Sequence, residues 1–127
     1  MGYWKGAQRG LEKAIKFYNK AKDDAALAQA LGTLATILVK MGNWDKAIEL
    51  YNKDLEISKK LGDVHGMAQT YGNLGLAYAK KGDVQKALRY LKEADAIRKS
   101  LGLPPLLPAD ERKGLSRPKR GSRGKKK

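Results

Sequence analysis

The chain has 127 residues, which favours a single domain with a modest core, and its 27 Lys and Arg against 13 Asp and Glu give a net charge of +14. It contains no cysteine, which excludes disulfides and thiol chemistry and is typical of a reducing compartment. No stretch approaches the roughly 20 apolar residues that a membrane-spanning helix needs, and no secretory signal is recognisable, so we expect a cytoplasmic protein without a membrane span.

The sequence up to Gly102 repeats itself. Residues 27–54 align with residues 67–94 at an offset of 40, and residues 11–21 align with residues 44–54 at an offset of 33. Apolar residues recur at three- and four-residue steps in each copy, which predicts helices, and no alternating run of β-branched residues predicts a strand. We therefore predict five helices, at residues 4–22, 25–41, 44–61, 65–81 and 84–101.

Turn residues separate the predicted helices. Gly42 and Gly82 stand where a helix would end with a residue at positive φ. Asn43 and Asp83 follow these glycines and are expected to cap the next helix with their side chains. Each pair of helices should therefore be joined by a short turn and pack antiparallel.

Two glycines lie inside the fourth predicted helix. Glycine in a helix interior costs about 1 kcal/mol relative to alanine, so each of them needs a reason. We expect Gly75 to let this helix approach the small Ala87 of the next helix, with Leu91 filling the space around the contact. Gly72, like its repeat-mate Gly32, is then expected to face an open groove.

The pattern of small and large residues resembles the tetratricopeptide repeat. Two full copies fit the template and a half copy precedes them, so the resemblance covers about residues 11–101. The 40-residue period is similar to the long variety of this repeat, which occurs in the light chain of kinesin and in polarity adaptors that bind receptor-linked G proteins. The resemblance is carried by Ala14, Tyr18 and Ala21, by Leu31, Leu34, Ala35, Leu38, Gly42, Ala47 and Tyr51, and by Tyr71, Leu74, Gly75, Tyr78, Gly82, Ala87, Leu91 and Ala94.

The resemblance implies an all-α, right-handed superhelical solenoid of helix hairpins, with a half repeat at 4–22 and full repeats at 25–61 and 65–101. It also implies a non-catalytic scaffold that binds a peptide segment of a partner protein, without a cofactor or a metal. The first helix of each hairpin would line the concave groove. The expected contact residues in that groove are Gln29, Thr33, Thr36, Lys40, Gln69, Asn73, Leu76 and Lys80.

The groove chemistry limits the kind of ligand. Asn73 can donate to and accept from a peptide backbone, and Lys40 and Lys80 can meet a carboxylate. In some family members a set of Lys, Asn and Arg residues binds the C-terminal carboxylate of a ligand. In this chain Thr36 and Gly32 occupy positions where that set has Asn and Lys. We therefore do not expect a ligand of the chaperone-tail type, and Asn73 has the alternative role of bracing the neighbouring repeat.

Candidates for catalysis or metal binding are weak. His65 is the only histidine, and without a Cys or His partner it is interpreted as part of a helix start beside Asp63. No phosphate-binding loop, nucleophile elbow or zinc helix occurs, so no enzymatic activity is expected. Acids that alternate with Lys at helical spacing are interpreted as solvated faces: Asp45, Glu49, Glu56, Asp63, Glu93 and Asp95.

Residues 103–127 differ in composition from the repeats. The sequence LPPLLP at 103–108 predicts an extended linker, because its prolines break a new helix. Residues 112–127 hold nine basic residues and no acid, which predicts a disordered basic tail and leaves +5 on the first 111 residues. The tail residues expected to contact nucleic acid or another anion are Arg117, Lys119, Arg120, Arg123, Lys125, Lys126 and Lys127.

Several alternatives stay open at this stage. The tail is compatible with a nucleic-acid-binding or ribosome-associated accessory protein, with a nuclear-import signal, or with a solubilising extension. The short array leaves a helix face without its usual neighbour at both ends. Self-association through those ends, a fragment of a longer array, and a designed array without a native ligand would each account for this.

Overall fold

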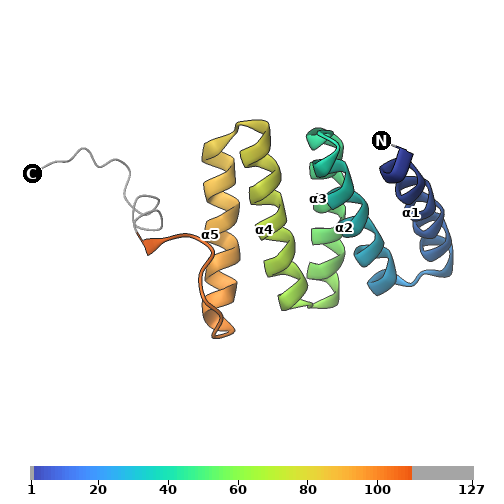
Figure 1. Ribbon diagram of the computed structural model, residues 1–127. Helices are drawn as coiled ribbons and strands as arrows, with labels where there is room; N and C mark the ends of the chain where they lie inside the picture. The colour runs from blue at the N-terminus through green and yellow to red at the C-terminus, as the bar shows by residue number, and fades with distance from the viewer. Residues whose placement is uncertain (1, 110–127) are drawn as a thin grey trace, which may run out of the picture.

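The computed structural model describes residues 2–109, and the basic tail with its expected anion contacts lies outside the described residues. Within that range the chain forms five helices and no strand (Figure 1). Every boundary falls within two residues of its predicted position. The helices are α1 (Gly2–Ala21), α2 (Asp24–Lys40), α3 (Trp44–Leu61), α4 (Val64–Lys81) and α5 (Val84–Ser100).

The helices stand side by side in chain order and build an all-α solenoid (Figure 1). Each helix packs against the next one along the chain, and α2 also contacts α4. The first helices of the two full hairpins are therefore neighbours, and the surface they share is the concave side of the array. The core beneath it is formed by residues such as Leu34, Leu38, Tyr51 and Leu74, all of which are buried.

The turns follow the expected chemistry with one exception. Gly42 and Gly82 have positive φ angles of 84° and 100°, as predicted. The Asp83 carboxylate accepts a hydrogen bond from the backbone N–H of Lys86 at 3.1 Å, which caps α5. The prediction for Asn43 is wrong, because its side chain makes no capping hydrogen bond. A neutral amide attracts the partial positive charge of a helix N-terminus less strongly than a carboxylate does.

The close approach predicted at Gly75 is confirmed. A Cβ placed on this glycine would lie 2.6 Å from Leu91 Cγ and 3.1 Å from the carbonyl oxygen of Ala87. Real side chains do not tolerate such contacts, so α4 and α5 lie as near to each other as they do because residue 75 has no side chain.

The segment of residues 103–107, which we call the strap, turns back along α5 (Figure 1). The Asp95 carboxylate accepts hydrogen bonds from the backbone N–H groups of Leu106 at 2.6 Å and Leu107 at 2.9 Å. Arg98 Nε donates to the carbonyl oxygen of Pro104 at 2.7 Å, and Leu107 is only 7% exposed. The predicted linker therefore begins with a segment that packs on the solenoid.

The strap corrects two expectations from the sequence. Asp95 does not belong to a solvated face: it is 6% exposed, because the strap covers it and donates one hydrogen bond to each of its oxygens. Gly72 does not face an open groove, because a Cβ there would lie 3.2 Å from Leu106 Cδ1. At the offset of 40, Asp95 corresponds to the buried core residue Leu55, so the last repeat replaces an apolar contact with an anchor for the strap.

Candidate functional site

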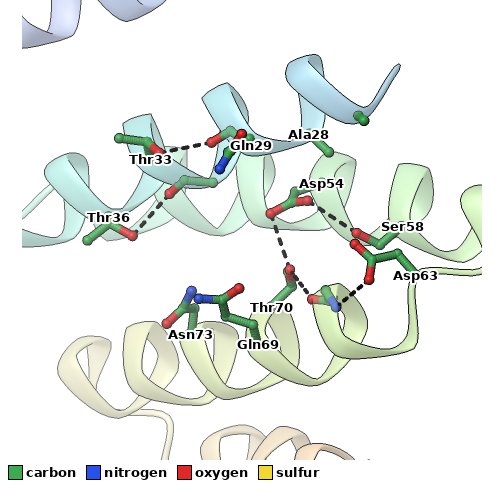
Figure 2. Close-up of a pocket in the computed structure, with 13 residues that line it drawn as sticks. Ala28, Gln29, Thr33, Thr36, Asp54, Ser58, Asp63, Gln69, Thr70 and Asn73 are labelled. Atoms are coloured by element: carbon green, nitrogen blue, oxygen red, sulfur yellow. Dashed lines mark hydrogen bonds between the residues drawn. The ribbon is translucent and has the colours of Figure 1, made fainter. Parts of the chain in front are cut away.

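Two adjacent cavities open on the concave side of the solenoid. The first, which we call the acidic cavity, has a volume of about 450 Å³ and lies between α2, α3 and α4 (Figure 2). It is lined by Ala25, Ala28, Gln29, Gly32, Thr33, Thr36, Asp54, Ser58, Asp63, Gly66, Gln69, Thr70 and Asn73.

The second cavity, which we call the lysine cavity, has a volume of about 390 Å³ and shares Thr36 and Asn73 with the first. Its other lining residues are Val39, Lys40, Gly42, Trp44, Tyr51, Leu76 and Lys80. All eight groove residues expected from the sequence therefore line one or both cavities. Together the two cavities form a continuous groove along α2 and α4.

A carboxylate from α3 lies within the acidic cavity (Figure 2). Asp54 accepts hydrogen bonds from Thr70 Oγ1 at 3.2 Å and from Ser58 Oγ at 3.4 Å. Opposite it, a Cβ on Gly32 would lie 2.7 Å from Asp54 Oδ2. Gly32 therefore does not border empty space, as the sequence suggested, but leaves room for the Asp54 side chain. Sequence analysis missed Asp54, Ser58 and Thr70 as groove residues.

The polar side chains of the groove differ in whether they are already bonded. Thr33 donates to the carbonyl oxygen of Gln29 at 2.9 Å, and Thr36 pairs with the Tyr51 hydroxyl at 2.6 Å. By contrast, the side-chain amides of Gln29, Gln69 and Asn73 make no hydrogen bond within residues 2–109 (Figure 2). Within the described residues these three amides therefore have unpaired donors and acceptors, and no hydrogen bond ties Asn73 to the neighbouring repeat.

Comparison with known families decides the identity of this helical array. Residues 26–100 match the family model described as tetratricopeptide repeat, which is more than half of the chain. The chain belongs to the tetratricopeptide repeat family. A comparison with curated proteins finds no match. The family match does not separate the long variety of the repeat from other members, so that subtype stays a prediction.

Membership of the tetratricopeptide repeat family indicates the general class of function. Tetratricopeptide repeats are generally protein–protein interaction modules, and the family is typically non-catalytic. None of the helices within residues 2–109 has the length and apolar character needed to cross a membrane.

Asp54 departs from the other tetratricopeptide copies of this chain. At the offsets of 40 and 33 its counterparts are the small residues Ala94 and Ala21. Ala94 is completely buried. An Asp in this place is the one signal in the sequence that could have pointed to Asp54, and it requires reading the copies against one another for a difference.

The electrostatics of Asp54 are unfavourable to its charge. Burial raises the pKa of the Asp54 carboxyl above its usual value, and nearby Asp63 raises it further, while the hydrogen bonds from Thr70 and Ser58 oppose the shift. Burial also raises the pKa of the Tyr51 hydroxyl, with the charge of Asp54 as a smaller contribution. No Lys or Arg forms an ion pair with Asp54 in the described part of the chain.

Asp54→Asn is expected to melt at a higher temperature than the parent at neutral pH. The folded-state pKa of Asp54 is raised, so as the pH rises from about 3.9 the unfolded chain loses this proton first and the free energy of unfolding of the parent falls. Asn carries no charge and keeps an oxygen that accepts from Thr70. Thermal melts between pH 3 and pH 7 check this: the advantage of the variant should grow with pH, and a variant that melts lower at pH 7 would contradict it.

Proposed function

We propose that this tetratricopeptide protein is a non-catalytic scaffold that holds an extended segment of a partner protein in the concave groove between α2 and α4. The observation that carries the proposal is the set of three unbonded amides, Gln29, Gln69 and Asn73, along one groove. An amide side chain both donates and accepts, which matches the alternating N–H and C=O groups of an extended peptide backbone.

The groove has the size for a short peptide. Its lining residues on α4 run from Gly66 to Lys80, which at 1.5 Å per residue is about 21 Å. An extended chain advances about 3.3 Å per residue, so a segment that fills both cavities has about six residues. Leu76, which is 52% exposed, gives the lysine cavity an apolar surface for one side chain of that segment.

Asn73→Ala combined with Leu76→Glu is expected to weaken partner binding by at least about tenfold, which corresponds to about 1.4 kcal/mol. The double change removes one backbone-binding amide and places a charge on the apolar wall. The full chain is used to capture partners from cell extract at moderate salt, which suppresses non-specific contacts of the basic tail. The affinity of a captured, purified partner is then measured for the parent and the variant.

The matched control is Asn52→Ala combined with Val84→Glu, because both side chains are exposed and neither lines the two groove cavities. This control should bind the partner like the parent. Equal affinity of the groove variant and the parent would show that the partner binds elsewhere, for example on the tail.

A further inference from the structure

We infer that the acidic cavity is a binding site for a cationic side chain, Lys or Arg, of the partner segment. This inference rests on the proposed function, since it assigns one residue of the peptide that the groove would hold. It goes beyond a general peptide groove because it specifies the charge of the ligand group and the residue that recognises it.

The first argument is that Asp54 has acceptor capacity left over. A carboxylate offers about four lone-pair positions, and within residues 2–109 only Ser58 and Thr70 donate to it, one to each oxygen. Both bonds are long, at 3.4 Å and 3.2 Å, and the Thr70 hydroxyl also donates to the carbonyl oxygen of Gly66. The carboxylate therefore lacks strong donors of its own.

The second argument is the charge of the surroundings. The chain as a whole carries +14, yet no described Lys or Arg forms an ion pair with Asp54. The second acid of the cavity, Asp63, caps α4 by accepting the N–H of Gly66 at 2.9 Å, and no described Lys or Arg forms an ion pair with it. A half-buried carboxylate without a cationic partner destabilises the fold unless a bound group supplies the opposite charge.

The third argument is that the cavity walls fit a group that only donates hydrogen bonds. The side-chain amides of Gln29 and Gln69 line the same cavity as Asp54 (Figure 2), and each amide carries an oxygen that can accept a hydrogen bond. The lack of a side chain at Gly32 leaves room for the Asp54 carboxylate in the cavity wall. Lys and Arg have donors and no acceptor, and their bonds to a carboxylate are charge-assisted. A volume of about 450 Å³ accommodates either head group.

The geometry also fixes the spacing within the ligand. Gln69 of the acidic cavity and Leu76 of the lysine cavity lie seven positions apart on α4, which is about 10 Å along the helix. This distance equals about three residues of an extended peptide. The expected motif is thus a basic residue about three positions away from an apolar one.

The test is a positional-scanning library of short linear peptides, screened at moderate salt against the full-length parent, Asp54→Asn and Glu93→Gln. The parent should enrich Lys or Arg over Asp or Glu at one position by at least about tenfold, the effect of one charge-assisted contact. Asp54→Asn should lose that preference and still select an apolar residue nearby. Glu93→Gln, which removes an exposed acid outside both groove cavities, should behave like the parent.

The outcomes separate this inference from the proposed function. If none of the proteins enriches any peptide, peptide binding in the groove fails and the inference fails with it. If the parent enriches peptides without a basic preference, or Asp54→Asn keeps the preference, the inference fails while the proposed function stands. Because Asp54→Asn is expected to be at least as stable as the parent at neutral pH, a melt of the same sample shows that a lost preference does not come from unfolding.

We assign the basic residue to the partner, and the chain's own basic residues 112–127 are the competing occupant that a second experiment tests. A full-length variant with Arg117, Lys119 and Arg120 changed to Gln distinguishes them. If the tail competes for the acidic cavity, peptides selected by the parent will bind this variant more tightly. If their affinity is unchanged, the cationic group belongs to the partner.

Discussion

Replacement of Gly75 by leucine is expected to lower the free energy of unfolding by about 3 kcal/mol, and replacement by alanine by about 1–2 kcal/mol. A Cβ at this position would lie 2.6 Å from Leu91 Cγ, 2.8 Å from Leu91 Cδ2 and 3.1 Å from the Ala87 carbonyl oxygen. Alanine regains about 1 kcal/mol of helix propensity, which offsets part of the clash. Leucine gains no more than that and must force α4 away from α5.

Gly10→Ala provides the matched control, since Gly10 lies inside α1 and a Cβ there would meet no atom within 4 Å. Gly10→Ala should therefore show only the gain in helix propensity and raise the free energy of unfolding by about 0.5–1 kcal/mol. Urea unfolding followed by circular dichroism measures all three variants. A Gly75→Ala protein as stable as Gly10→Ala would mean that α4 and α5 do not depend on the missing side chain.

The contrast between Gly75 and Asn43 shows what the sequence could predict. Periodicity predicts the five helices and their boundaries. Comparison of the two full copies predicts the contact at Gly75, because both copies have small residues at the positions where their helices pack. The cap at Asn43 could not be read in this way. Whether a neutral side chain bonds to a helix end depends on a small free-energy difference that repeat position does not encode.

Asp54 and the strap mark the limit of the prediction for the site. The resemblance to the tetratricopeptide repeat led us to expect eight residues of α2 and α4 on the concave side, and all of them line the groove cavities. Asp54 comes from α3, the second helix of its hairpin, so an assignment of the groove to first helices excluded it. Its position beside Gly32 is a property of how α2 and α3 pack.

The strap was missed for a related reason. Residues 103–108 form no helix, as their three prolines predict. The prolines do not determine whether the resulting irregular chain stays on the solenoid. That depends on Asp95, which at helical spacing looks like one more member of a charged face. Its role became clear only with the positions of Leu106 and Leu107, eleven and twelve residues further on.

Asp95→Ala is expected to lower the free energy of unfolding by about 2–4 kcal/mol. The change removes the acceptor for two backbone N–H groups, at 2.6 Å and 2.9 Å, and hydrogen bonds to a charged group are worth about 1.5–3 kcal/mol each. Part of this free energy is recovered when the backbone N–H groups of the released strap form hydrogen bonds with water. Leu107 then loses its burial, so the loss includes the hydrophobic contribution of that side chain.

Asp95 and Leu107 should be coupled if they act through the same segment. Leu107→Ala alone is expected to lower the free energy of unfolding by about 2 kcal/mol. The double variant should lose clearly less than the sum of the two single losses, because either change alone already releases the strap from α5. Glu93→Gln, an exposed acid two residues away, controls for the loss of charge and should change stability by less than about 0.5 kcal/mol. Strictly additive losses in urea unfolding would show that Asp95 stabilises α5 by itself and does not act through the strap.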